Sequence, residues 1–313
     1  MIEKQDENGE IPSLVKEKIQ EIKNDSVHGS TILLNDAINV FQNFISSEQP
    51  ISIHLLQTIA LQLIQAQPTM ASLVTFSNKL LNFMEDFPHM NKNQETFKNS
   101  LNSFLKQFRE SLEKSEKAIQ KNAVNHLESY SLIATYSLSG TIQKVIESLA
   151  KHRNNLTVYC SESRPNNEGT LLAKTLANQG IKTILMTDAT LFSSISEVNA
   201  VIIGADAITK NGVVNKMGSY PLSQLSNQNN VSVYCVCSFN KMLPADYSLP
   251  REPEKPSSDI LSEKYLNLDV INYYFDTTPL ELFTGIITEK GLLTYEKIRE
   301  YLEDTTLHPC LKD

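Results

Sequence analysis

The feature that most constrains the fold of this chain is an alternation that begins near Asn122. From there, short apolar runs bounded by turn residues alternate with longer amphipathic stretches. Apolar runs of this length are typical of buried strands. They predict strands at Ser131–Tyr136, Leu156–Cys160, Lys182–Met186, Ala200–Ile203 and Val231–Val236. Strands that are apolar throughout and separated by helices belong to a parallel sheet that is covered on both faces.

The intervening helices are expected to begin near Ser139, Glu168, Ala189 and Ser219. Near the end of the chain we predict a strand, a helix, a strand and a helix, at Val270–Phe275, Pro279–Phe283, Gly285–Thr288 and Thr294–Tyr301. The segment Pro244–Lys264 contains four prolines and many charges, which indicates an exposed loop.

The first third of the chain has a different texture. From Pro12 to about Lys121 it contains almost no glycine, and apolar residues recur at spacings of three and four. Asp86–His89 interrupts this pattern, and a long amphipathic stretch follows from Asn93. We therefore expect an α/β protein, with an N-terminal helical domain at residues 1–121. A Rossmann-like, doubly wound and mostly parallel sheet is expected at residues 122–313.

Composition excludes several classes of protein. The net charge of -8 disfavours a nucleic acid as the main partner, because backbone binding requires clustered Lys and Arg, so no direct DNA binding is expected. No run reaches the roughly 18 apolar residues of a membrane span, and the first residues carry no signal-peptide pattern, so we expect a cytoplasmic protein without a membrane segment. The four cysteines and six histidines show no metal-ligand spacing, so we expect neither a metal nor a cofactor.

In open parallel sheets, ligands bind beyond the carboxyl ends of the strands, where helix N-termini present N–H groups. Four predicted strands end in small or polar residues: Thr135–Gly140, Ser161–Gly169, Thr187–Asp188 and Gly204–Asp206. Each segment by itself is more typical of a turn with a helix cap. Because four of them occur at strand ends, we expect them to meet at one crevice.

The stretch VIIGADAITKNGVVNKMGSY, at residues 201–220, indicates a site. Gly204 allows a tight turn, and Asp206 would then face the crevice, where shielding from water would raise its pKa toward the range needed for proton transfer. Capping of the turn is the alternative role for Asp206. Arg164 and Lys216 suit phosphate binding. Arg164 could equally pair with a nearby carboxylate, and Lys216 could be a solvated surface lysine.

Three segments together, ESRPNNEG, GADAITKNGVVNKMGSY and DTTPLELFTGIITEKG, resemble one superfamily over nearly the whole chain. It joins the alpha, beta and delta subunits of translation initiation factor 2B to ribose-1,5-bisphosphate isomerase and methylthioribose-1-phosphate isomerase. For the isomerases, the resemblance implies an aldose-to-ketose conversion of a phosphosugar. It assigns the catalytic Asp to Asp206, and substrate binding to Asn215 and Lys216 and to the loop of His28, Gly29 and Ser30.

The chain departs from the isomerase pattern at three positions. The catalytic Cys of the isomerases aligns with Ser137, and a hydroxyl forms an anion far less readily than a thiol does. Ser137 could still donate a hydrogen bond to a developing oxyanion. A Gln of the isomerases is replaced by Glu168, whose charge repels phosphate, and a phosphate-binding Arg is replaced by His28.

Two functions follow from this resemblance. The Glu168 pattern favours the initiation-factor branch, in which the fold has a regulatory or assembly role and the pocket binds a sugar phosphate or a nucleotide monophosphate without turnover. The retained Asp206 favours an isomerase with altered chemistry. In both cases the resemblance implies a homodimer or higher oligomer, and the acidic surface suggests a protein partner.

Overall fold

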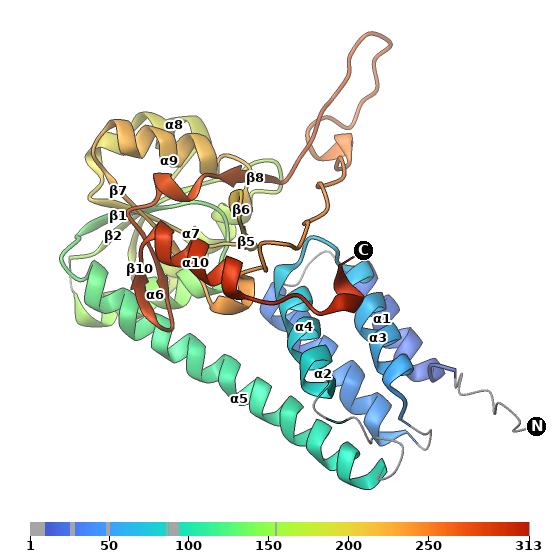
Figure 1. The fold of residues 1–313 in the computed structure, drawn as a ribbon. Helices are drawn as coiled ribbons and strands as arrows, with labels where there is room; N and C mark the ends of the chain where they lie inside the picture. Colours follow the sequence, from blue (N-terminus) through green and yellow to red (C-terminus); the bar gives the residue numbers. More distant parts are fainter. Residues whose placement is uncertain are drawn as a thin grey trace, which may run out of the picture.

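The computed structural model describes residues 10–25, 29–47, 51–85, 87, 94–153 and 155–312. The chain forms a helical part and an α/β part (Figure 1). The helical part consists of α1 (Ser13–Asn24), α2 (Ser30–Ser46), α3 (Ile53–Ala66), α4 (Ala71–Glu85) and α5 (Gln94–Leu127).

The helical part packs around a core of its own. Phe41 and Phe44 of α2 and Phe76 of α4 are fully buried. The ring of Phe76 contacts Phe41 edge-on at 5.7 Å between centroids and Phe108 of α5 at 4.9 Å. Aromatic contacts of this kind add to the stabilisation from apolar burial. The apolar residues that recur with a 3.6-residue period in the sequence therefore face the core of the helical part.

The α/β part contains a seven-stranded sheet with the order β10-β9-β7-β4-β1-β2-β3. All neighbouring strands are parallel except β10 and β9. The strands are β1 (Leu132–Thr135), β2 (Thr157–Ser161), β3 (Lys182–Met186), β4 (Ala200–Ile203), β7 (Ser232–Val236), β9 (Gly285–Thr288) and β10 (Gly291–Leu293). The five strands predicted between residues 131 and 236 are confirmed, with bounds that differ by at most a residue or two.

Helices cover both faces of this sheet, as expected for a doubly wound fold. On one face, Ile133, Val158 and Ile202 pack with α5, α6 (Gly140–His152) and α7 (Glu168–Asn178). The opposite face carries α8 (Asp188–Ser193), α9 (Ser219–Gln228) and α10 (Tyr295–Asp304). Adjacent strand residues such as Ile133 and Ala134 thus enter different cores, which explains why these strands are apolar throughout.

A second, three-stranded sheet was not predicted. It has the order β5-β6-β8, with β5 (Ala207–Thr209), β6 (Gly212–Lys216) and β8 (Phe275–Thr278), and its neighbouring strands are antiparallel. The predicted strand at Val270–Phe275 is therefore wrong, because pairing with β6 begins only at Phe275. The predicted helix at Pro279–Phe283 is only a short 3-10 turn, Leu280–Leu282.

The two parts of the chain are joined by several elements. Helix α5 continues past residue 121, the expected domain boundary, and the Asn122 amide donates to the Thr288 carbonyl of β9 at 2.8 Å. The C-terminal tail returns to the helical part, where Asn78 of α4 hydrogen-bonds to Thr306 and His308. These contacts hold the helical part beside the α/β part and fix the space between them.

The segment expected to be an exposed loop is largely irregular. Residues 255–272 form a projecting loop that extends away from the body of the protein (Figure 1). The regular element in the projecting loop is a short 3-10 turn, Ser257–Asp259. The base of this loop is fastened by Asn272, whose amide donates to Pro256 and Asp259. Across the described ranges of the chain, no helix has the length and apolar character needed to cross a bilayer.

Candidate functional site at the topological switch point

The sheet reverses its winding between β1 and β4. The chain moves from β1 to β2 on one side, whereas β4 lies on the other side of β1. Ligands in open α/β sheets bind at such a switch point, beyond the carboxyl ends of the strands. Thr135 of β1 is level with Ile202 of β4, so the residues that follow these two strands leave the same edge of the sheet.

Gly204 is required by close packing at this point. A Cβ atom on Gly204 would lie 2.8 Å from the hydroxyl oxygen of Ser139, which caps α6. The absence of a side chain therefore lets the end of β4 approach the N-terminus of α6. Two residues later, the Asp206 N–H donates to the Val214 carbonyl at 2.8 Å, which starts the small sheet.

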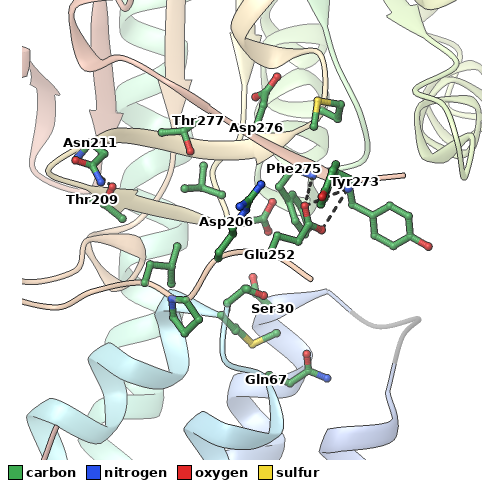
Figure 2. Close-up of a pocket in the computed structure, with 18 of the residues that line it drawn as sticks. Ser30, Gln67, Asp206, Thr209, Asn211, Glu252, Tyr273, Phe275, Asp276 and Thr277 are labelled. Carbon is green, nitrogen blue, oxygen red and sulfur yellow. Dashed lines mark hydrogen bonds between the residues drawn. The ribbon is translucent and has the colours of Figure 1, made fainter. Parts of the chain in front are cut away.

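A cavity of about 950 Å³ lies between the helical part, the small sheet and the root of the projecting loop. Figure 2 shows Asp206 and Glu252 facing one another in it, with Ser30 and Gln67 on the helical side and Thr277 on the small sheet. Four cationic side chains also line it: Lys23, Lys210, Arg251 and Lys255. Four carboxylates, Asp25, Asp206, Glu252 and Asp276, line it as well, so among the described residues the cavity mixes carboxylates and cations in equal number.

Asp206 lines this cavity in an environment that favours its neutral form. Burial raises the pKa of Asp206, and the charges of Glu168 and Glu252 raise it further. The ammonium groups of Lys241 and Lys216 oppose this shift. The direction of this shift is the one expected of Asp206 from the sequence.

Lys241 is a site residue that the sequence reasoning missed. It follows β7, the strand next to β4, and its ammonium group donates to the Ser30 hydroxyl at 2.5 Å. Burial lowers the pKa of Lys241, while Asp206 opposes that shift. Its position in the sequence could have identified it, because a polar residue that follows β7 lies at the same edge of the sheet as Asp206.

Lys216 is not a solvated surface lysine. Its side chain is 3% exposed, and its ammonium group lies 2.8 Å from Oε1 of Glu168 at the start of α7. The same ammonium group lies 5.1 Å from the centre of the Tyr274 ring, which lines the cavity. The neighbouring Asn215 amide donates to the Ser219 hydroxyl at 2.8 Å, so Asn215 helps to fix the start of α9.

Carboxylates gather beside the Tyr136 hydroxyl at the end of β1. Burial raises the pKa of Tyr136 well above its ordinary value, and Asp188, Asp276 and Glu168 add to that shift. Asp276 accepts hydrogen bonds from the N–H groups of Gly218 at 2.7 Å and Tyr220 at 3.1 Å. Burial raises the pKa of Asp276 to about 6, although these hydrogen bonds oppose the shift.

Ser137 and Arg164 do not line the cavity. Ser137 has a left-handed backbone with φ of 66°, and its N–H donates to the Ser163 hydroxyl at 2.8 Å. Arg164 is exposed, and its guanidinium donates to the Pro165 carbonyl. Gly29 and Ser30 do line the cavity, whereas His28 lies outside the described residues.

A search for metal ligands gave no candidate cluster. In residues 10–25, 29–47, 51–85, 87, 94–153 and 155–312, no group of three or more His, Cys, Asp or Glu side chains is arranged to hold a metal ion.

The fold and the cavity define an α/β protein with a polar cavity between its N-terminal helical part and its small sheet. Residues 26–295 match the Initiation factor 2 subunit family, and the chain belongs to that family. This bears out the superfamily resemblance of the three sequence segments.

The relatives carry two kinds of name. Ribose 1,5-bisphosphate isomerase of Methanocaldococcus jannaschii is 31% identical over 238 residues, which is 74% of each chain. A putative translation initiation factor eIF-2B subunit 2-like protein of Pyrococcus horikoshii is 27% identical over 292 residues, or 90% of this chain and 97% of the relative. A crystal structure of Pyrococcus horikoshii translation initiation factor eIF-2B superposes with a TM-score of 0.75 at 26% identity, covering 91% of this chain and 98% of that one.

Proposed function

We propose that this protein binds a phosphorylated sugar or a nucleoside monophosphate in the cavity, and acts as a regulatory or assembly subunit of the initiation factor 2B type. The observation that carries this proposal is that Ser30 of the helical part and Asp206 of the α/β part line the same cavity, and that Lys241, which is not itself a lining residue, donates to the Ser30 hydroxyl. A ligand there would touch both parts of the chain, so binding would affect how they are held together.

The helical side of the cavity suits an anion. Helix α2 begins at Ser30, and a helix N-terminus carries partial positive charge on its first N–H groups. Lys241 donates to the Ser30 hydroxyl, and Lys23 and Arg251 are cations of the lining, which also contains the carboxylates of Asp25, Glu252 and Asp276. These groups would hold a phosphate, while carboxylates such as Glu252 would accept hydrogen bonds from ligand hydroxyls.

The absence of a thiol at position 137 argues against turnover. Ser137 stands between Tyr136 and Leu138, and a serine hydroxyl needs a strong neighbouring base to become an anion. The hydroxyl group that contacts its backbone belongs to Ser163, which is itself paired with Ser161 at 2.7 Å. Binding without chemistry is therefore the better match to these residues.

A phosphosugar aldose-ketose isomerase is the second candidate. The raised pKa of Asp206 and the 31% identity to a ribose 1,5-bisphosphate isomerase favour it. In this case Asp206 would transfer a proton between the reacting carbons, Ser137 would polarise the reacting oxygen, and Lys241 and Ser30 would hold a phosphate.

Thermal melting tests the binding proposal. We expect ribose 5-phosphate, ribose 1,5-bisphosphate, methylthioribose 1-phosphate or AMP to raise the melting temperature of the wild type. The same measurement is made on the Asp206→Asn variant. Asp269→Asn, which changes an exposed residue of the projecting loop, is its matched control. If none of these compounds stabilises the protein, the pocket proposal is wrong.

Isotope exchange separates the two candidates. A regulatory protein should not transfer solvent deuterium into a bound phosphosugar. Exchange that is present in the wild type and lost in Asp206→Asn, but kept in Asp269→Asn, would instead establish the isomerase. Ser137→Cys extends this test, because a gain of turnover would show that a thiol is the missing group.

We also propose that the protein forms a homodimer or a higher oligomer, as the resemblance implies, that it is cytoplasmic, and that its acidic surface contacts a protein partner. The exposed apolar residues of the projecting loop, which include Leu266 at 98% exposure, are consistent with a protein contact. Light scattering of the purified chain measures the oligomeric state, and a monomer at micromolar concentration would contradict this part of the proposal.

A further inference from the structure

The projecting loop and the cavity meet at shared residues. Lys255, where the loop begins, and Tyr274, two residues after it ends, both line the cavity. The loop is closed at this root, because the Lys255 N–H donates to the Asn272 carbonyl at 2.9 Å and the Asn272 amide donates to the Asp259 carboxylate at 3.1 Å. Outer residues such as Leu266 are exposed. The direction of the loop is therefore set at its root.

Tyr274 connects this root to a carboxylate of the cavity. Its hydroxyl donates to Oδ2 of Asp259 at 2.7 Å, the same oxygen that the Asn272 amide contacts. The Tyr274 N–H lies 3.2 Å from both carboxylate oxygens of Glu252, and the Phe275 N–H donates to Oε2 of Glu252 at 2.9 Å (Figure 2). Tyr274 is thus hydrogen-bonded to the loop through its side chain and to the cavity wall through its backbone.

Two cations lie beside the Tyr274 ring. The ammonium groups of Lys255 and Lys216 are each 5.1 Å from its centre, a distance at which a cation is attracted to an aromatic ring. Lys255 also lies 3.5 Å from Oε1 of Glu252, so it contacts both Tyr274 and the carboxylate that holds Tyr274. Lys216 is paired with Glu168. Of the two cations, Lys255 is the one that lines the cavity and that a ligand there would meet.

We propose that Tyr274 makes the projecting loop responsive to the cavity, so that an anion bound at Lys255 loosens the root of the loop. The anion competes with Glu252 and with the Tyr274 ring for the Lys255 ammonium group. The contacts that position Tyr274 are then weakened, and with them its hydrogen bond to Asp259. This inference rests on the proposed function only for the presence of a ligand, because the coupling itself lies between residues of the chain.

Hydrogen exchange in residues 255–261 tests the contact between Tyr274 and the loop. Four N–H groups of this segment are hydrogen-bonded at the root: those of Lys255, Asp259, Ile260 and Leu261. Their exchange with deuterium reports how tightly the root is held. Tyr274→Phe removes the hydroxyl that binds Asp259, and we expect these amides to exchange about tenfold faster. Tyr273→Phe, which removes the hydroxyl of the adjacent tyrosine, is the matched control and should exchange like the wild type.

Glu252→Gln tests the coupling from the cavity side. It removes the charge that attracts Lys255, and it should speed exchange in residues 255–261 about two- to fivefold. In the Tyr274→Phe background the same change should have no further effect, because the connection to Asp259 is already lost. Glu254→Gln, which changes an exposed carboxylate two residues away, is the matched control and should leave exchange unchanged in both backgrounds.

Ribose 5-phosphate provides the ligand test. At a concentration that calorimetry shows to be saturating, it should speed exchange in residues 255–261 of the wild type and leave Tyr274→Phe unchanged. Binding without a change in exchange would overturn the inference and leave the proposed function standing. Failure of ribose 5-phosphate to bind would count against the proposed function, and the Glu252→Gln comparison then decides the inference by itself.

Equal effects of Glu252→Gln in the wild-type and Tyr274→Phe backgrounds would overturn the inference, because Tyr274 would then not connect the cavity to the loop. If Tyr274→Phe does not fold, Asp259→Asn takes its place in each comparison, since it changes the acceptor of the same hydrogen bond.

Discussion

The ammonium group of Lys241 lies 2.5 Å from the hydroxyl oxygen of Ser30, and this hydrogen bond connects the α/β part to the first turn of α2. The two residues are 211 positions apart in the sequence. The charge of Asp206 also raises the pKa of Lys241 against the effect of burial. The contact between the helical part and the α/β part at Ser30 therefore involves a lysine that is electrostatically coupled to Asp206.

Replacement of Lys241 should weaken phosphate binding. In Lys241→Met, the ammonium group is lost while much of the apolar stem is kept, so we expect the affinity for ribose 5-phosphate to fall about 10- to 100-fold. Calorimetric titration measures this change. Lys174→Met removes an exposed lysine from α7 and should bind like the wild type. Equal affinities in the two variants would show that Lys241 does not contact the ligand.

A second prediction concerns the close approach of Gly218 to Tyr136. Gly218 has a φ of +108°, and a Cβ atom there would lie 2.4 Å from the Tyr136 hydroxyl oxygen. Gly218→Ala should therefore lower the free energy of unfolding by more than the roughly 1–2 kcal/mol of left-handed strain. Gly180→Ala isolates the strain, because Gly180 has a φ of +79° with open space around it. Urea denaturation that gives the same loss for both variants would contradict the close contact.

The raised pKa of Asp276 predicts a pH dependence of stability. The pKa of Asp276 rises from an ordinary 3.8 to about 6 on folding, so the folded state holds its proton more tightly than the unfolded state does. The resulting stabilisation is fully present below pH 4 and is lost as the pH rises through 6. The shift corresponds to about 3 kcal/mol.

Asp276→Asn should remove this dependence, because an amide keeps an acceptor for Gly218 and Tyr220 without titrating. Relative to the wild type, the variant should gain up to about 3 kcal/mol of unfolding free energy between pH 4 and pH 7. Asp206 titrates in both proteins, so the difference isolates Asp276. Urea denaturation at the two pH values measures it, and a constant difference would refute the assignment.

Most of the large sheet could be predicted from the sequence. Its central strands are buried on both faces, so their apolar character is local and continuous, as in Ala200–Ile203. The small sheet could not be found in this way. Its strands β6 and β8 are separated in the sequence by α9, β7 and the projecting loop, and pairing such as Val213 with Thr278 is a long-range contact that leaves no periodic signal.

The residues of the candidate site were also predictable only in part. Asp206, Gly29 and Ser30 were expected from motifs, and they line the cavity. The prediction for Arg164 rested on a motif alone, and its side chain is exposed. Lys241 carries no motif of its own, and its importance follows only from the distance between its ammonium group and Ser30.

The sequence by itself determined the order of the five central strands of the large sheet, the family, and the chemical types present at the strand ends, because these depend on local patterns of apolar and polar residues. Only the tertiary structure decided which charges meet. It joined Lys216 to Glu168 and left Lys241 beside a neutral hydroxyl, because electrostatic energy depends on separation and burial in space rather than on position along the chain.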